Sequence, residues 1–111
     1  MAGEEPSLKV VRTEKAFNDL KEIWRWNTQF YSLEHADQYY QFLTEQILEL
    51  GKFNRRGCVV DGFPNLRYWR IARKPRKHGH VIVYQVTDDA VYILHVFHSA
   101  QDWQSKLGHE T

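Results

Sequence analysis

Residues 33–50 read LEHADQYYQFLTEQILEL, and the spacing of their apolar side chains decides the fold. These side chains recur at steps of three and four, at Leu33, Ala36, Tyr40, Leu43, Ile47 and Leu50. Such steps place them on one face of an α-helix. The stripe is too short for an independent coiled coil, so we expect it to face a sheet. Gly51 follows the last apolar position and predicts a left-handed cap.

A second helix is predicted upstream of this stretch. Leu8 to Arg12 is a β-branched run typical of a short strand, and Thr13 can then cap a helix over Glu14 to Gln29. The apolar positions of that segment share one helical face, at Ala16, Leu20 and Ile23, with Phe17 and Trp24 beside them. A break around Thr28 to Ser32 separates the two helices, which predicts an antiparallel helical hairpin.

Downstream of Gly51 the pattern changes to that of strands. We expect four apolar strands, at Cys58 to Val60, Leu66 to Arg73, Val81 to Val86 and Val91 to Phe97. The connections between them are a turn at Gly62 to Asn65, a basic hairpin tip at Arg73 to Gly79 and a turn at Asp88 and Asp89. Consecutive strands with tight loops form a meander. The sequence therefore predicts an α+β fold of order β-α-α-β-β-β, with the helical hairpin packed on an antiparallel sheet.

The length of the chain fits one domain. With 111 residues and 13.3 kDa, residues 1–111 can bury one core but not two. Residues 1–7 form a polar leader, and the tail at 104–111 is polar apart from Leu107. No apolar run is long enough to cross a bilayer, and Glu4 and Glu5 stand where a signal peptide carries lysines, which predicts a cytoplasmic protein without a membrane partner. Cys58 is the single cysteine, so no internal disulfide is expected.

Charge is distributed unevenly around a net value of +1. Residues 1–51 hold five basic and nine acidic side chains, whereas residues 52–80 hold nine basic side chains and only Asp61 as an acid. Residues 81–111 return to an acidic balance, with Lys106 against four carboxylates. The central basic block predicts a surface that attracts phosphates or an acidic protein partner. A merely solvated loop is the alternative interpretation.

Common catalytic and metal-binding motifs are missing from the sequence. It has no phosphate-binding glycine loop and no serine on a hydrolase-type elbow. Four histidines, His78, His80, His95 and His98, form two pairs without a carboxylate at fixed spacing. Metal sites usually need three or four ligands, so we expect neither a metal nor a cofactor.

A metal-free ribonuclease needs a base, an acid and cations around the phosphate. The side chains that could serve are His80, Tyr84, His98, Arg70 and Arg73. In the competing interpretation, which we favour, Tyr84 belongs to the core, the histidines cap strand ends and the arginines face solvent or a partner.

Large aromatic side chains are candidates for stacking on bases. Trp24, Trp26, Tyr39 and Tyr40 fall in the helices, and we expect most of them in the core. Trp69 lies in the basic strand and Trp103 in the tail, so these two are the candidates for an interface.

Three groups of residues match a known pattern. The first helix carries Ala16, Asp19, Leu20, Ile23 and Trp24; the second half carries Gly62, Pro64, Leu66 and Arg67, then His80, Ile82, Tyr84 and Val86; the closing stretch is His95 to Trp103. Through these motifs the chain from Val10 to Trp103 resembles the RelE/ParE superfamily of bacterial type II toxin–antitoxin toxins. Gln101 departs from the arginine that is usual in the closing stretch.

The resemblance implies the same β-α-α-β-β-β fold and two alternative activities. The RelE branch cleaves ribosome-bound mRNA with arginine, tyrosine or histidine just after the last strand, where this chain has Ser99, Ala100 and Gln101. The ParE branch poisons DNA gyrase without a catalytic residue, and an antitoxin neutralises it. We favour the ParE reading. A degenerate member that binds antitoxin but is not toxic is a third alternative.

The ParE reading implies a target-binding or antitoxin-binding surface on the basic strand, its hairpin and the closing stretch. The residues expected there are Arg67, Trp69, Arg70, Arg73, Lys74, Arg76, Lys77, His98, Asp102 and Trp103. The implied partners are a cognate antitoxin and DNA gyrase, or ribosome-bound mRNA in the RelE alternative. The resemblance is compatible with a higher-order toxin–antitoxin oligomer.

Overall fold

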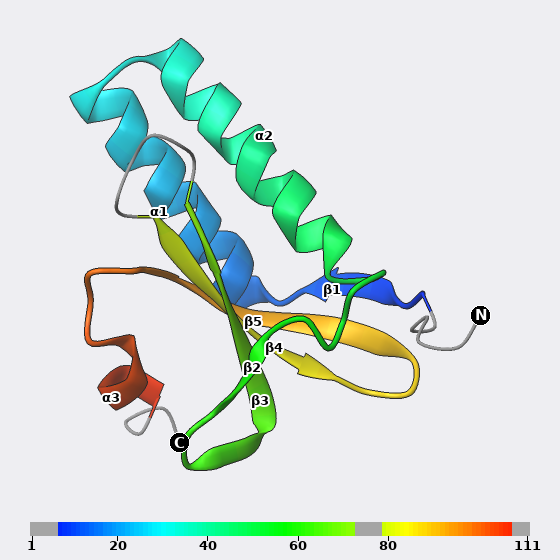
Figure 1. Ribbon diagram of the computed structural model, residues 1–111. Helices are drawn as coiled ribbons and strands as arrows, with labels where there is room; N and C mark the ends of the chain where they lie inside the picture. The colour runs from blue at the N-terminus through cyan, green and yellow to red at the C-terminus, as the bar shows by residue number, and fades with distance from the viewer. Residues whose placement is uncertain (1–6, 73–78, 108–111) are drawn as a thin grey trace.

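The computed structural model describes residues 7–72 and 79–107, which form an α+β fold. In chain order its elements are β1 (Lys9–Arg12), α1 (Glu14–Phe30), α2 (Leu33–Glu49), β2 (Cys58–Val60), β3 (Phe63–Ile71), β4 (His80–Val86), β5 (Ala90–His98) and α3 (Trp103–Leu107). The predicted helical hairpin and the strands that follow it are confirmed (Figure 1). None of the helices in the described residues is long and apolar enough to cross a membrane.

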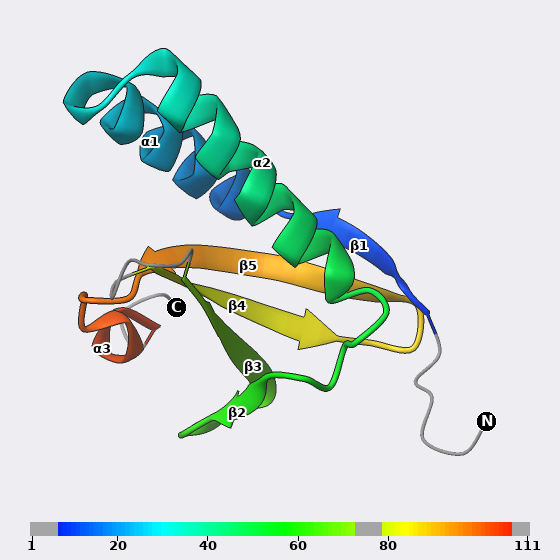
Figure 2. The same cartoon turned by 45° about the horizontal axis from the view of Figure 1, so that its top comes forward.

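The sheet is mixed rather than antiparallel throughout. Its strand order is β1-β5-β4-β3-β2, and β1 pairs with β5 in parallel while the other neighbours are antiparallel. The prediction of an antiparallel sheet is therefore wrong for this one pair. An apolar run identifies a strand but does not say which strand lies beside it. Figure 2 shows β1 near the lower end of the helices, where it runs beside β5.

Each face of the sheet has its own apolar cluster. α1 and α2 cover one face, where Ile82 and Tyr84 of β4 point toward the hairpin. Val81 and Val83 point to the other face and meet Trp103 and Leu107 from the C-terminal segment. The apolar exceptions of the C-terminal segment, Trp103 and Leu107, are both buried and anchor it to the sheet. Residues 1–6 of the predicted leader and 108–111 of the tail lie outside the described residues.

The two helices begin as the sequence predicts but are separated by a shorter break. Thr13 Oγ1 accepts a hydrogen bond from Ala16 N at 3.3 Å, which confirms the N-cap of α1. The predicted break began at Thr28, yet the helix continues to Phe30, and Tyr31 N still donates to the Asn27 carbonyl at 2.9 Å. Ser32 caps α2 by accepting from His35 N at 3.0 Å.

The buried stripe of α2 differs from prediction at two positions. Tyr39 is buried and Tyr40 only partly so, and Leu33 is exposed at the start of the helix. The remaining positions of the stripe are buried as expected. The helix faces both α1 and the sheet, so its contact face is broader than one step pattern can define.

Gly51 does not form the predicted left-handed cap. Gly62 is the residue with positive φ in the described part of the chain, so Gly51 has an ordinary backbone conformation. Its lack of a side chain matters for another reason: a Cβ at Gly51 would lie 2.5 Å from the Leu8 carbonyl oxygen. Leu8 N donates to the Gly51 carbonyl at 2.8 Å, so the end of α2 is joined to the segment before β1.

The turn between β2 and β3 is shorter than the predicted Gly62 to Asn65. Val60 pairs with Phe63, which leaves only Asp61 and Gly62 between the strands. Gly62 has a backbone φ of +83°, a value that residues other than glycine and asparagine rarely adopt. β3 therefore begins at Phe63 and ends at Ile71, and Arg73 of the predicted strand lies outside the described residues.

Candidate functional site

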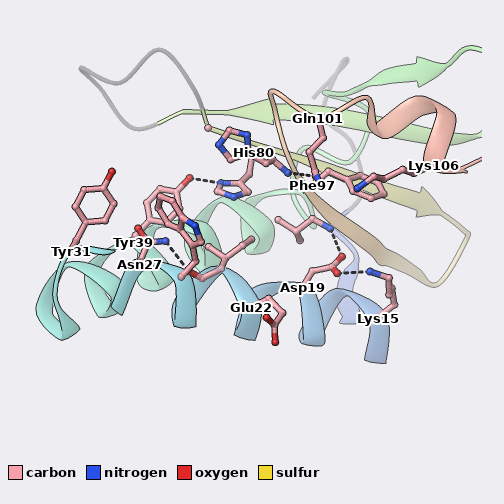
Figure 3. Close-up of a pocket in the computed structure, with 15 residues that line it drawn as sticks. Lys15, Asp19, Glu22, Asn27, Tyr31, Tyr39, His80, Phe97, Gln101 and Lys106 are labelled. Atoms are coloured by element: carbon pink, nitrogen blue, oxygen red, sulfur yellow. Dashed lines mark hydrogen bonds and ion pairs between the residues drawn. The ribbon is translucent and has the colours of Figure 1, made fainter. Parts of the chain in front are cut away.

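A groove of about 1050 Å³ opens between α1 and the adjoining ends of β4 and β5. Figure 3 shows its wall formed by the helical hairpin on one side and by the segment leading to α3 on the other. Its lining includes both cationic and acidic side chains, Lys15 and Lys106 with Asp19 and Glu22. The groove is therefore balanced in charge, although the chain's basic block is contiguous with its rim at Gly79.

Two histidines meet at one end of this groove. His80 is the first residue of β4 and pairs with His98, the last residue of β5, and their rings lie 5.3 Å apart. This placement confirms that the histidines stand at strand ends. His80 is buried, and its Nδ1 lies 2.6 Å from the Tyr39 hydroxyl of α2. Burial, together with the neighbouring His98, lowers the pKa of His80 from 6.5 to about 4, so this imidazole is neutral at pH 7.

The segment after β5 is held in place by short-range hydrogen bonds. Gln101 Oε1 accepts from His98 N at 3.0 Å, and His98 Nδ1 accepts from Ala100 N at 3.1 Å. Ser99 and Gly79 are joined twice, through Gly79 N to Ser99 Oγ at 3.0 Å and Ser99 N to the Gly79 carbonyl at 2.9 Å. The glutamine that replaces the usual arginine thus bonds to the backbone of the strand end.

Asp19 connects α1 to the sheet beneath the groove. Its Oδ2 accepts from Val96 N at 3.0 Å, and its Oδ1 pairs with Lys15 at 2.5 Å. Residues 19 and 96 are far apart in sequence, so this contact fixes the helix on β5. The sequence singled out Asp19 only as part of a family motif; its bond to β5 gives that motif a physical reason.

Of the five residues considered for nuclease chemistry, Arg73 lies outside the described residues and the other four do not converge. Tyr84 is fully buried, and its hydroxyl accepts from Gly57 N at 2.9 Å, away from the histidine pair. Arg70 pairs with Val81, which belongs to the opposite face of the sheet from His80. Only His80 and His98 come together in the groove. The prediction that Tyr84 belongs to the core is confirmed.

The residues predicted for partner binding are divided among several places. Arg67 and Trp69 lie on the helix-facing side of β3, and Arg70 lies on the other side. Trp103 is buried against Tyr68 and Phe97, with ring centroids 5.0 and 6.2 Å apart, so it offers no exposed surface to a partner. Asp102 is exposed. The remaining predicted residues lie outside the described residues: Arg73, Lys74, Arg76 and Lys77, and with them His78.

Exposed aromatic side chains near the connection between α1 and α2 were not predicted. Trp26 and Tyr31 line the groove and are 51% and 53% exposed, so Trp26 lies outside the core that we expect for most of the helix aromatics. Their rings lie 5.7 Å apart, and Phe30 adds a further contact to Trp26 at 4.8 Å. Trp26 stands outside the apolar stripe of α1, and this departure from the step pattern is the signal that could have identified it.

The buried His80 predicts a specific pH dependence of stability. The folded-state pKa of about 4 lies below the ordinary 6.5, so the unfolded chain binds an extra proton between these values and stability is lost as the pH falls through this window. We expect the free energy of unfolding to fall by about 2 kcal/mol between pH 7 and pH 5 on account of this group. His80→Asn, which retains an acceptor but does not titrate, should lack this component in urea unfolding at both pH values. Equal losses in the two proteins would contradict the assignment.

Comparison with known proteins places this geometry in a family. The sequence profile described as the ParE toxin of the type II toxin–antitoxin system, parDE, matches residues 10–103. Among solved structures, a chain of the chromosomal ParDE TA system from P. aeruginosa superposes with a TM-score of 0.71 and 21% sequence identity, covering 85% of this chain and 98% of that chain. At that identity the likeness establishes a shared fold. No curated protein sequence matches the chain.

Proposed function

Since the chain belongs to the ParE family of toxins from type II toxin–antitoxin systems, we propose that it inhibits DNA gyrase and that a cognate antitoxin neutralises it. The observation that carries the choice of target is the composition of the groove. The groove joins two histidines to a strand end occupied by Ser99, Ala100 and Gln101, and Gln101 is bonded to the backbone. A binding surface is compatible with such a site. The cations of the groove are Lys15, which pairs with Asp19, and Lys106, and neither belongs to the segment 99–101 in which the RelE branch carries arginine, tyrosine or histidine.

The proposed antitoxin would have two surfaces available. The groove offers aromatic side chains on one wall and a balanced set of charges, which suits an amphipathic polypeptide. The basic block offers charge complementarity to an acidic segment, which would raise the association rate and weaken with added salt. An antitoxin that occupies both would bury more surface than either alone. Because gyrase acts on chromosomal DNA, we propose the cytoplasm as the site of action.

A gyrase assay tests the proposed target. The purified protein should inhibit supercoiling by gyrase and accumulate cleaved DNA, while ribosome-bound mRNA stays intact at the same salt concentration. Leu48→Ala serves as the control variant and should inhibit gyrase as the unaltered protein does, since this exposed residue of α2 neither lines the groove nor belongs to the expected binding residues. Cleaved mRNA with normal gyrase activity would overturn the proposal.

The histidine pair supports one alternative, a metal-independent mRNA endoribonuclease of the RelE type. The buried, neutral His80 could accept a proton, and the ring of His98 lies 5.3 Å from it. In that case the protein should cut ribosome-bound mRNA at pH 7 and His98→Ala should abolish that cleavage, while gyrase activity stays normal. Normal growth on expression of the protein, with neither assay positive, would instead indicate a degenerate family member.

A further inference from the structure

A basic and aromatic surface lies on the helix-facing side of the sheet, beyond the edge of α2. It consists of Phe53, Arg56, Val59, Arg67 and Trp69 and is called here the Arg56 surface. Val59 of β2 pairs directly with Arg67 of β3, and Trp69 follows two positions along on the same side of the strand. Figure 2 shows β3 and β2 extending away from the part of the sheet that the helices cover.

Arg56 is held at the centre of this surface by the two rings beside it. Its guanidinium lies 4.7 Å from the ring centre of Phe53 and 5.0 Å from that of Trp69. Its Nη1 also pairs with Glu49 of α2 at 3.3 Å. A cation fixed between aromatic faces loses less conformational entropy when it binds an anion than a free side chain does.

Arg67 is likewise oriented before any partner binds. Its Nη1 donates to the Gly57 carbonyl at 2.7 Å, and a longer contact of 3.5 Å reaches the Arg55 carbonyl. Both contacts use the same nitrogen, and a guanidinium has donors on three nitrogens. Arg67 can therefore bind a carboxylate through its other donors without giving up the contacts that position it.

The charge around this surface favours an acidic partner. The surface holds the cations Arg56 and Arg67, and the connection between α2 and β2 adds Lys52 and Arg55, whereas the acid in contact with it is Glu49, which pairs with Arg56. The apolar members of the surface narrow the choice further, because Phe53 and Val59 are 47% and 50% exposed. A nucleic acid supplies phosphates but no aliphatic side chains to cover Val59, whereas a polypeptide can supply both carboxylates and apolar groups.

We propose that the Arg56 surface binds an acidic polypeptide segment in which apolar side chains alternate with carboxylates. The carboxylates pair with Arg56 and Arg67, and the apolar side chains cover Phe53 and Val59. The natural carrier of this segment is the antitoxin, and in that respect the inference rests on the proposed function. It assigns the contact of the basic block to these five residues, which are separate from the groove because none of them lines it.

Peptide binding to the full chain tests this inference without gyrase or an antitoxin. The probes are a fluorescein-labelled peptide alternating glutamate and leucine, a peptide of equal length alternating glutamate and serine, and an oligothymidylate of equal charge, measured by fluorescence anisotropy at physiological salt. We expect the glutamate–leucine peptide to bind about tenfold more tightly than the other two, the difference that burial of a few apolar groups supplies.

Variants assign the binding to the surface. Arg56→Gln and Val59→Glu should each weaken binding of the glutamate–leucine peptide about tenfold, the first by removing a cation and the second by placing a carboxylate against the acidic segment. Arg56→Gln could disturb the fold. Val59→Glu then still tests the surface, because Val59 is exposed and its replacement leaves the fold intact. The matched control is Arg12→Gln, which removes another arginine that lies over a ring, 5.8 Å from Phe17, and should bind the peptide as the unaltered protein does.

The alternative results are separable. If the glutamate–serine peptide binds as tightly as the glutamate–leucine peptide, the surface recognises charge alone. If oligothymidylate binds more tightly than the glutamate–leucine peptide and its binding depends on Arg56, the surface is a nucleic-acid site. Either result overturns the inference. Inhibition of gyrase without Arg56-dependent peptide binding would overturn this inference and leave the proposed function standing. Peptide binding without gyrase inhibition would support the surface and reject the proposed target.

Discussion

Leu43→Ala should lower the free energy of unfolding by about 2–5 kcal/mol, the range measured when a large buried aliphatic side chain is truncated. Leu43 is 0% exposed and belongs to the cluster between the helical hairpin and the sheet. Its neighbours in that cluster include Tyr84 and Ile93, which come from two central strands. The cavity left by the substitution would be enclosed by both layers, so little of the cost could be recovered by local collapse. Urea unfolding, monitored by circular dichroism, measures this loss in the free energy of unfolding.

The same substitution elsewhere in α2 provides the control. Leu48 lies in the same helix and is 58% exposed, so Leu48→Ala changes helix propensity by the same amount but removes little buried surface. We expect its effect to stay within about 0.5 kcal/mol. Similar losses in the two variants would show that α2 does not pack on the sheet through the Leu43 face, and the fold described here would then be wrong.

Gly57→Ala should destabilise the protein by about 2–4 kcal/mol through crowding and a lost hydrogen bond. A Cβ at this position would lie 2.5 Å from the Tyr68 carbonyl oxygen and 2.6 Å from the Tyr84 hydroxyl oxygen. Both neighbours belong to the sheet, and Gly57 N itself donates to the Tyr84 hydroxyl at 2.9 Å. Any shift that relieves the clash also lengthens this buried bond. Thermal and urea unfolding of the variant measure the loss.

Two further variants separate the causes. Gly62→Ala meets no atom within 4 Å but forces alanine into φ of +83°, so it should cost only about 1–2 kcal/mol. Tyr84→Phe removes one of the two crowded contacts and leaves the Tyr68 carbonyl in place, so Gly57→Ala should remain destabilising in that background. If Gly57→Ala destabilises the protein no more than Gly62→Ala does, the loop before β2 relaxes freely around the added methyl group.

Much of the fold can be predicted from the sequence because its helices and strands have clear periodicity. The steps of three and four in residues 33–50 and the apolar runs of β4 and β5 give the elements within one or two residues. The parallel pairing of β1 with β5 is not predictable in this way, since each strand's own pattern is the same whichever neighbour it has. The role of Gly51 was missed for a related reason: its neighbour is the Leu8 carbonyl, on a distant part of the chain.

The candidate site was only partly predictable. His80 and His98 could be placed at strand ends, and the register of β4 and β5 then brings them together. Tyr39, which bonds to His80, lies one position away from the residue that the α2 step pattern selects. Arg56 and Phe53 belong to an irregular connection between α2 and β2, where no periodicity indicates how side chains point. Contacts that depend on loop geometry could therefore not be predicted from the sequence.

The pairing of β1 with β5 has a consequence for synthesis of the protein. Thr13 donates to the Ile93 carbonyl through both its amide and its hydroxyl, and Asp19 accepts from Val96, so contacts that hold the first strand and helix span most of the chain. Pairings of such long sequence separation form late and slowly. While β5 is still inside the exit tunnel, a nascent chain has no partner for β1. The first strand and helix therefore gain these contacts only after β5 has been synthesised, and each newly made molecule passes through an interval in which its groove does not yet exist.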